Sequence, residues 1–338
     1  MQQVEQEVVR LCQSGLDVAA VRAQVLRALR RVMPVDAAFV ATADPGTLLF
    51  TGVAADEPLA DATQQFLDNE FGLADVNHFA ALATAPRHVA SLDEATNLDR
   101  PVSARYRDIM RPLGLGDELR AALTVGAECW GYLCLHREDH RLGFTEDEAA
   151  LVARVAPHIA HALRQSILLS GPSTGAARGP GVVVLAEDLT VLAVTPQAEL
   201  LLDQFGGAGT LPVPLRGVAS ALRSSAAGTL PSVRVRTRTG DWLAVHASRL
   251  SGSGDQQIAV VIEPVEARDA VPLMLAAYGL TAREAEIATQ VLRGRSTRAI
   301  SDELHISQYT VQDHLKAVFD KTGVRNRRAL VSQLLGTG

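Results

Sequence analysis

The fold of the last part of this 338-residue chain is decided by a stretch that opens with Leu280-Thr281-Ala282-Arg283-Glu284. Thr281 can cap the N-terminus of a helix, and Glu284 stands three residues on, where its carboxylate can complete a capping box. Apolar residues then recur at helical spacing until Gly294, a residue that favours a helix end. The pattern predicts one short amphipathic helix between these two signals.

Two further helices follow with almost no connection between them. The second is expected over about Thr297 to Leu304, and Ser307 then caps a third helix that runs to about Thr322. Gly323 provides a Schellman-type end. Two helices joined by so short a turn, the second longer and capped, predict a helix-turn-helix.

The third helix is expected to be amphipathic. Its apolar side, which should pack on the first two helices, carries Val311, Leu315, Val318 and Phe319. The opposite side carries Gln308, Tyr309, Gln312, Asp313 and Lys316. These amide, phenol, carboxylate and ammonium groups can read base edges in the DNA major groove. The polarity of this side alone is equally compatible with an ordinary solvated helix.

The order of residues in this segment favours the interpretation that the third helix binds DNA. Its order Leu280-Thr281-x-Arg283-Glu284, Ile306-Ser307-x-x-Thr310-Val311-x-x-His314-Leu315 and Lys321-x-Gly323-Val324-x-x-Arg327 resembles the LuxR-type DNA-binding domain. The resemblance covers about residues 274–338, with the helix-turn-helix motif at about 297–316. It implies an all-α four-helix domain whose third helix reads DNA.

The same resemblance implies the site residues. The DNA-binding positions would be Ser307, Gln308, Tyr309, Thr310, Gln312, Asp313, His314, Lys316, Arg325 and Arg327. A fourth helix, about Asn326–Leu335, would dimerise through Leu330 and Leu334. Many members of the family have Lys where this chain has Gln312. Because Gln suits adenine and Lys suits guanine or phosphate, this departure affects the target sequence.

Charge is divided unevenly along the chain. The formal net charge is −6, yet from Leu280 onward nine basic and six acidic residues give +3, which leaves −9 for the rest. Hydrophobic residues make up 47% of the chain, enough for two or three packed domains. A basic segment on an acidic body fits a regulator better than a protein that coats DNA.

The N-terminal body alternates helical and strand patterns. A long amphipathic helix is expected over 4–33, strands over 37–42 and 47–53, and a hairpin from 119–125 and 129–136. Along the last strand, Cys129 and Cys134 should point to opposite faces. The capping box Thr145-x-x-Glu148 then opens a helix that runs to about Leu169.

This order of elements resembles a GAF sensor domain over residues 1–165. The resemblance rests on the sequence Leu119-Arg120-Ala121-Ala122-Leu123 followed by Cys129-Trp130-Gly131-Tyr132-Leu133. It implies an α/β sensor. The helix that leaves this domain has apolar spacing from Val152 to Leu169, compatible with a dimeric coiled-coil seam or with an ordinary core helix.

Residues 166–180 are rich in Gly, Ser and Pro, which predicts a flexible linker. Beyond them, strands are expected at 182–185 and 189–194, a helix from Pro196, and three strands at 233–238, 242–250 and 258–262. This order resembles a small PAS-like α+β domain over 181–268.

Several clusters allow more than one interpretation. Arg234, Arg236 and Arg238, with Arg249 across the hairpin, favour a solvated strand face or a seam to the acidic body over an anion site. The spacing of His158 and His161, and of His136 and His140, allows a metal, but neither pair has a third ligand at suitable spacing. We predict no metal, cofactor or catalytic residues.

The sequence therefore predicts a multidomain α+β chain: a GAF-like sensor, a PAS-like domain and a helix-turn-helix. Its expected function is dimeric transcription regulation, with double-stranded DNA and RNA polymerase as partners and a small molecule or a protein as effector. A thiol redox enzyme is the alternative from another class. With no signal peptide and no membrane-length apolar run, a cytoplasmic protein is expected.

Overall fold

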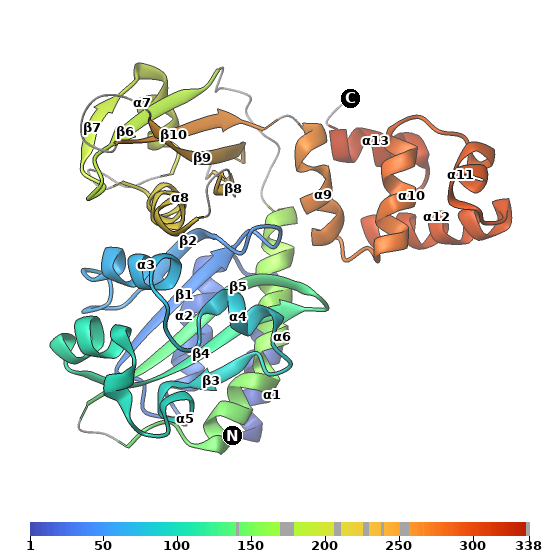
Figure 1. Ribbon diagram of the computed structural model, residues 1–338. Coiled ribbons are helices and arrows are strands. Elements are labelled where there is room, and N and C mark those ends of the chain that lie inside the picture. The colour runs from blue at the N-terminus through green and yellow to red at the C-terminus, as the bar shows by residue number, and fades with distance from the viewer. Residues whose placement is uncertain are drawn as a thin grey trace. The chain divides into compact units, whose positions relative to one another are not determined.

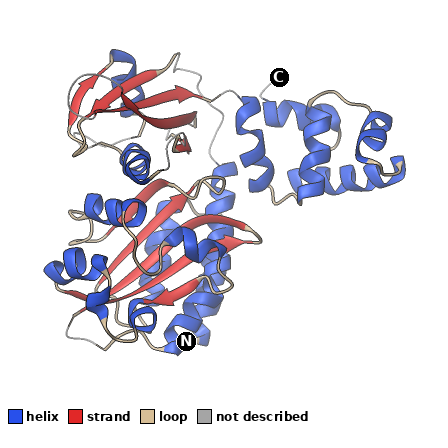
Figure 2. Ribbon diagram, in the orientation of Figure 1, coloured by secondary structure: helices blue, strands red, loops and turns tan. Residues whose placement is uncertain are grey.

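The computed structural model describes residues 1–139, 142–169, 179–205, 211–225, 230–237, 240–250, 257–265 and 267–335. The chain forms two compact units. Unit 1 comprises Met1–Ser166 and Gly171–Pro264, and unit 2 comprises Ile167–Ser170 and Val265–Gly338. Unit 1 contains two β-sheets, whereas unit 2 is helical (Figure 2). Most of the predicted linker at 166–180 lies outside the described residues.

The first domain of unit 1 is built on an antiparallel sheet with the strand order β2-β1-β5-β4-β3. Its strands are β1 (Ala37–Ala43), β2 (Phe50–Ala55), β3 (Val89–Ser91), β4 (Leu115–Val125) and β5 (Glu128–Glu138). Helices α1 (Gln2–Cys12), α2 (Val18–Leu29) and α6 (Glu146–Leu169) lie on one face of it, and α3 (Thr63–Gly72) and α4 (Phe79–Thr84) on the other (Figure 1). Short helical turns after β3, beginning with α5 (Leu92–Thr96), fill the connection to β4.

The expected single helix over 4–33 is wrong, because the chain turns between α1 and α2. Gly15 adopts φ +69°, and the side chain of Asp17 accepts a hydrogen bond from the backbone N of Ala20 at 2.8 Å. A left-handed glycine followed by an N-cap ends one helix and starts another. The helical spacing of apolar residues continues across the break, so the sequence pattern did not reveal the turn.

The expected orientation of the two cysteines on β5 is also wrong. The pairing of β4 with β5 shifts between Leu123 and Thr124, so that Trp130 is an extra residue in β5. Because a bulge reverses the alternation of side chains, Cys129 joins Tyr132 and Cys134 in one apolar cluster. Strict alternation along the sequence could not reveal this.

Helix α6 begins as the sequence predicts. The backbone N of Thr145 donates to Glu148 Oε2 at 2.8 Å, and the backbone N of Glu148 donates to Thr145 Oγ1 at 3.3 Å. The seam residues Val152, Val155, Ile159 and Ala162 are at most 6% exposed within this single chain. They belong to the core of the first domain, so the coiled-coil interpretation gives way to the ordinary core helix.

The second domain of unit 1 has a sheet in the order β7-β6-β10-β9-β8, which repeats the connectivity of the first sheet. Its elements are β6 (Gly181–Leu185), β7 (Val191–Val194), α7 (Pro196–Asp203), α8 (Val213–Ser224), β8 (Ser232–Arg236), β9 (Trp242–Leu250) and β10 (Gln257–Pro264). Alternate strand residues pack with α7 and α8 in one core. The predicted strands and helix are present at close to their expected positions, and residues 238 and 239 lie outside the described part.

Unit 2 consists of α9 (Ala267–Ala277), α10 (Ala282–Leu292), α11 (Thr297–Leu304), α12 (Gln308–Thr322) and α13 (Arg327–Leu335). The last four match the predicted helices, and the capping box of Thr281 with Glu284 is present. Helix α9 was not predicted, although Val271 and Leu275 belong to the core of this unit. Pro272 lies inside α9, and a proline within a helical pattern is normally taken as a helix end. Among the described residues, every helix is too short or too polar to cross a lipid bilayer.

Candidate nucleic-acid interface and sensory cavity

Helix α12 presents one side to the core of unit 2 and the other to solvent. Val311, Leu315 and Val318 are at most 1% exposed, whereas Tyr309 is 77% exposed. Gln308, Gln312, Asp313 and Lys316 are exposed with Tyr309. Ser307 caps the helix, because its Oγ accepts from the backbone N of Thr310 at 3.0 Å. The predicted division of this helix into a core side and a polar side is therefore confirmed.

The turn between α11 and α12 is held by residues that sequence reasoning missed. Ser301 Oγ donates to the carbonyl O of Ile306 at 2.5 Å, and the Ile306 backbone N donates to the carbonyl O of Ser301 at 3.1 Å. Arg283 Nη2 donates to the carbonyl O of Leu304 at 3.0 Å. His305 adopts the left-handed conformation at φ 52°. These bonds satisfy the end of α11 and fix the direction in which α12 leaves.

Thr297 links three helices at one edge of the exposed face. Its Oγ1 accepts from Arg327 Nη2 at 2.8 Å and from Gln312 Nε2 at 3.2 Å. Arg327 Nη1 also donates to the carbonyl O of Arg295 at 2.9 Å. Arg327, expected among the DNA-binding residues, is thus engaged in holding α13 against the start of α11, while Arg325 is exposed.

The remaining predicted positions differ in access. His314 and Thr310 are half-buried, so a smaller part of each is available to a partner than of Gln312 or Lys316. Leu330 and Leu334 are 0% and 2% exposed and lie in the core of unit 2. The prediction that these two leucines dimerise is therefore corrected: their side chains pack on the helices of their own chain. The sequence analysis predicted that the apolar residues of α13 contact a second copy of the chain, whereas they pack in the core of unit 2.

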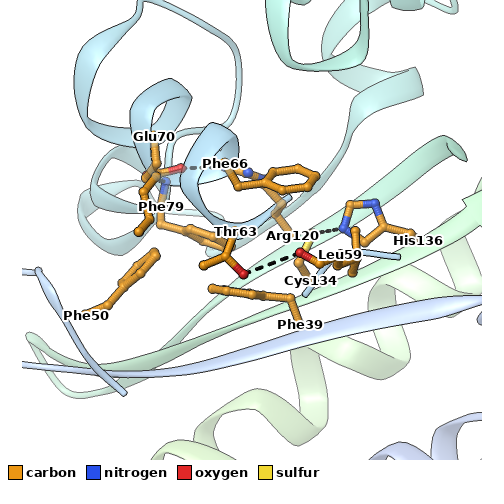
Figure 3. A pocket seen from close by; sticks show the side chains of 11 residues that line it. Phe39, Phe50, Leu59, Thr63, Phe66, Glu70, Phe79, Arg120, Cys134 and His136 are labelled. Carbon is orange, nitrogen blue, oxygen red and sulfur yellow. Dashed lines mark hydrogen bonds and ion pairs between the residues drawn. The ribbon is translucent and has the colours of Figure 1, made fainter. Parts of the chain in front are cut away.

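The first domain contains a cavity between its sheet and α3. The cavity measures about 30 Å³, and four phenylalanines, Phe39, Phe50, Phe66 and Phe79, are among the residues that line it. Phe50 lies at one end, and Cys134 and His136 lie at the other (Figure 3). Arg120 contributes its guanidinium 4.3 Å from the centre of the Phe79 ring. The room corresponds to about one or two water molecules, far below the roughly 300 Å³ of a typical ligand pocket.

A buried ion network stands beside this cavity. Glu118 Oε1 accepts from Arg105 Nε at 2.7 Å and lies 3.2 Å from Arg120 Nε. Arg120 Nη1 donates to Glu70 Oε2 at 2.7 Å. Burial opposes ionisation of Glu118, yet the two guanidinium groups outweigh it and hold the pKa of this carboxyl well below its usual range. Pairing of this kind is what allows charged groups to remain in a domain core.

Neutral groups complete the network. Burial raises the pKa of the Cys134 thiol, and burial lowers the pKa of His136 to about 4, so both are uncharged at neutral pH. Burial also raises the pKa of the Cys129 thiol. Since thiol redox chemistry needs an accessible thiolate, the geometry gives no support to the enzyme alternative.

Helix α3 connects the cavity to the second domain. Thr63, Phe66, Leu67 and Glu70 face the cavity. Elsewhere on the same helix, Asp68 Oδ1 accepts from Ser220 Oγ at 2.8 Å and from Arg223 Nη1 at 3.2 Å, both on α8. Helix α3 therefore contacts both the cavity and α8.

A second contact joins the two domains of unit 1. Asp44 is 0% exposed, and its carboxylate accepts from the Arg234 backbone N at 3.0 Å, Nε at 3.0 Å and Nη2 at 2.9 Å. Leu49 from the same turn joins the core of the second domain. For Arg234, the predicted seam to the acidic body is confirmed. Arg236 instead donates to the carbonyl O of Gly240 at 3.2 Å, and Arg238 lies outside the described residues.

The histidine pairs singled out by spacing differ in what the described residues show of them. His161 Nδ1 accepts from Arg164 Nη2 at 3.0 Å, and His140 lies outside the described residues. His136 instead lies with Glu118 and Cys134, three groups whose ligand atoms are all within 4.8 Å of one another. The sequence does indicate that Glu118 and Arg120 share one face of their strand and that Cys134 and His136 share one face of theirs. Only the register between the two strands brings these two pairs together.

Unit 2 thus has the fold of a helix-turn-helix DNA-binding domain, and it follows a sensor-like domain in the chain. The profile of "Bacterial regulatory proteins, luxR family" matches residues 279–334, and that of "GAF domain" matches residues 17–163. The chain is 37% identical over 59 residues to "Spore germination protein GerE" of Bacillus subtilis (strain 168), which covers 18% of this chain and 80% of that protein. The chain belongs to the luxR family of bacterial regulatory proteins.

Other relatives also match over short segments. "Monoamine regulon transcriptional regulator" of Klebsiella aerogenes is 48% identical over 54 residues, 16% of this chain and 24% of that protein. "Probable transcriptional regulatory protein NarL" of Mycobacterium tuberculosis (strain ATCC 25618 / H37Rv) is 36% identical over 56 residues, 17% and 26%. The chain thus spans about a quarter of the length of these two relatives.

Solved structures resemble the chain at low identity. The crystal structure of Escherichia coli SdiA covers 98% of this chain and 96% of its own, with 12% identity and a TM-score of 0.38. The GAF domain/HD domain protein from Geobacter sulfurreducens covers 46% and 98%, with 19% identity and a TM-score of 0.33.

Proposed function

We propose that this protein regulates transcription by binding a specific DNA sequence through α12. The observation that carries the proposal is the exposed side of that helix, where Gln312, Asp313 and Lys316 stand on a core-anchored helix whose start is fixed by the turn before it. A rigid helix with amide, carboxylate and ammonium groups meets the geometric needs of major-groove reading. RNA polymerase is the implied partner at the promoter, and the cytoplasm is the implied location.

Chromatin immunoprecipitation with sequencing tests this function on the full chain. We expect discrete enriched sites that share one sequence motif, and purified protein should prefer that motif over unrelated DNA by about 1,000-fold or more. A binding profile without a shared motif, or equal affinity for all duplexes, would reject sequence-specific regulation.

We infer that the protein acts as a dimer on paired half-sites, with α13 at the contact. Because Leu330 and Leu334 are buried, the contact must use the accessible part of this helix, which includes Arg328, Val331 and Ser332. The half-sites should lie about 10 base pairs apart, centre to centre. Ser332→Arg should weaken binding to paired sites while leaving single half-site affinity unchanged. Unchanged cooperativity in fluorescence anisotropy would rule out this surface.

We further propose that the first domain modulates DNA binding through α3. Support comes from the position of α3 between the cavity and α8. The small size of the cavity favours an ion, a very small molecule or a protein partner over a large organic effector. The test compares operator affinity of the intact chain with that of residues 265–338, with and without cell extract. Equal affinity in all four measurements would exclude modulation.

The PAS-like interpretation of the second domain remains a proposal. The strand order β7-β6-β10-β9-β8 supports it, since the first and last strands of the domain lie side by side at the centre of the sheet. A solved structure of residues 179–265 superimposed on known PAS domains would test it.

A further inference from the structure

Three potential metal ligands, Glu118, Cys134 and His136, lie together beside the cavity, and two of them, Cys134 and His136, line it. Cys134 Sγ lies 3.2 Å from His136 Nε2 and 3.5 Å from Glu118 Oε2. All three residues are at most 2% exposed. Among the described residues, no other three Cys, His, Asp or Glu side chains have ligand atoms that all lie within 4.8 Å of one another. Thiolate, imidazole and carboxylate are the ligand types that Zn²⁺ accepts.

The two separations from the sulfur atom are close to those of a tetrahedral ion site. With Zn–S near 2.3 Å and Zn–N or Zn–O near 2.0–2.2 Å, tetrahedral angles place neighbouring ligand atoms about 3.3–3.7 Å apart. The two measured separations from Sγ, 3.2 and 3.5 Å, differ from those values by a few tenths of an ångström at most. Small side-chain shifts would therefore make room for an ion.

The carboxylate is oriented for this role. Arg105 and Arg120 both approach Oε1 of Glu118, whereas Oε2 faces the thiol. Such outer-shell bonds fix the direction of a ligand, although two cations beside a carboxylate also reduce its affinity for metal. Two β-strands carry the three side chains, with Glu118 paired opposite His136.

Formal charge permits a divalent ion here. The network holds three carboxylates, of Glu70, Asp75 and Glu118, and two guanidinium groups, of Arg105 and Arg120, for a net charge of −1. Binding a divalent cation and releasing the proton of Cys134 would make the whole network neutral. A monovalent ion would leave one negative charge in a buried site.

His136 lacks adequate partners without an ion. Its Nδ1 has no hydrogen-bond partner, and Nε2 contacts only a thiol, a weak donor and acceptor. Buried polar groups are normally satisfied, so this ring calls for an explanation. Coordination would replace the weak contact of Nε2 by a strong bond, and Nδ1 would stay without a partner among the described residues. The adjoining cavity of about 30 Å³ has room for a water molecule at a fourth position.

We propose that Glu118, Cys134 and His136 form a binding site for a divalent transition metal ion, with Zn²⁺ as the best match to the donor set. Three protein ligands and a solvent-filled fourth position define an open site in the centre of the first domain. This inference concerns the first domain alone and stands independently of the DNA-binding function.

Cobalt provides a direct test, because Co²⁺ bound to thiolate absorbs in the near ultraviolet by charge transfer. The full-length chain, purified from medium with added Co²⁺, should carry one Co²⁺ per chain and show that absorption, and Zn²⁺ should displace it. Cys134→Ser should abolish the charge-transfer absorption. His136→Asn should weaken Co²⁺ binding by more than about 100-fold, the upper range for loss of an outer-shell group.

Matched controls separate this site from others. Cys129→Ser removes a buried cysteine of the same apolar cluster and should keep both stoichiometry and absorption. His161→Gln removes a histidine of the exit helix and should also have no effect. Thermal unfolding without metal shows whether each variant is folded. Absence of Co²⁺ from the folded wild-type chain, or charge-transfer absorption that survives in Cys134→Ser, would overturn the proposal.

Discussion

Two side chains on α12 are expected to make different contributions to DNA binding. Lys316 carries a flexible point charge, whereas Gln312 offers an amide whose Nε2 is positioned by Thr297 at 3.2 Å. Lys316→Ala should weaken binding to specific and unrelated DNA alike and reduce the log–log salt slope by about 0.9. Gln312→Ala should change sequence preference more than overall affinity.

Fluorescence anisotropy over a range of salt concentrations and a set of singly substituted operators measures both effects. Gln312→Glu has nearly the same shape and serves as the matched control for the lost donor. If both alanine variants lowered affinity equally for every sequence, the assignment of roles would be wrong.

Glu284 should make the stability of unit 2 depend on pH. Burial opposes its ionisation, but Lys321 Nζ at 2.6 Å and the Thr281 backbone N at 2.7 Å outweigh this and lower the pKa of the carboxyl. A carboxyl with a depressed folded-state pKa stabilises the fold above its unfolded pKa of about 4.3, and the contribution is lost as pH falls through the folded value.

Denaturant unfolding of residues 265–338 at several pH values checks this effect. Glu284→Gln should cost about 1 kcal/mol at pH 7, the usual contribution of a cap, and the cost should shrink below about pH 4. Glu286→Gln, on the exposed side of α10, should stay within about 0.5 kcal/mol. A pH-independent difference would show that the charge of Glu284 contributes nothing.

Among the elements, α13 should respond to substitution as part of the core. Leu330→Ala removes a fully buried side chain and should lower the free energy of unfolding of unit 2 by about 2–5 kcal/mol. Arg328→Ala on the exposed side should change it by less than about 0.5 kcal/mol. The measurement is urea unfolding followed by circular dichroism. A stable Leu330→Ala variant that failed only to pair on DNA would restore the dimer role of this leucine.

Elements defined by local signals could be predicted from the sequence. Thr281 with Glu284, Ser307 and Gly323 specify the ends of α10 and α12 through bonds within a few residues, so those helices were found close to their true bounds. Elements that depend on distant packing were not. Helix α9 was not predicted because Pro272 lies inside it. Leu330 was predicted to contact a second copy of the chain, because the sequence does not show that its apolar side packs within the tertiary fold.

The candidate metal site could not be predicted from the sequence either. Its residues lie on two strands, and the register that pairs Glu118 with His136 follows from sheet formation rather than from any local pattern. The bulge that adds Trp130 to β5 likewise depends on the pairing of the two strands. The polar side of α12, in contrast, needed only helical periodicity.

For the whole molecule, the ion pair of buried Asp44 with half-buried Arg234 should contribute most of the polar stabilisation between the two domains of unit 1. Asp44→Ala removes three hydrogen bonds from Arg234 and one from the Gly46 backbone N, and it leaves the Arg234 side chain, 26% exposed, without its carboxylate. The full chain should lose about 2–4 kcal/mol of unfolding free energy, below the upper range for a pair with no solvent access.

Arg223→Ala breaks the contact with Asp68 at a pair more than one-third exposed, and it should cost at most about 1 kcal/mol. Urea unfolding followed by the fluorescence of Trp130 and Trp242, one in each domain, compares the two variants. If Asp44→Ala were no more costly than Arg223→Ala, the ion pair of Asp44 with Arg234 would have no special weight.

The shared strand order of the two sheets has a consequence for synthesis on the ribosome. In each domain the central strands are the first and the last along the chain, β1 beside β5 and β6 beside β10. After residue 43, β2 follows at once, but translation must add the chain up to residue 138 before β1 can gain its second neighbour, β5, a delay of roughly 5–20 s at typical elongation rates. During that interval the nascent β1 has an unpaired edge, the feature by which growing chains on one polysome aggregate. Slow decoding before residue 138 should therefore lower the yield of folded protein more than slow decoding after it.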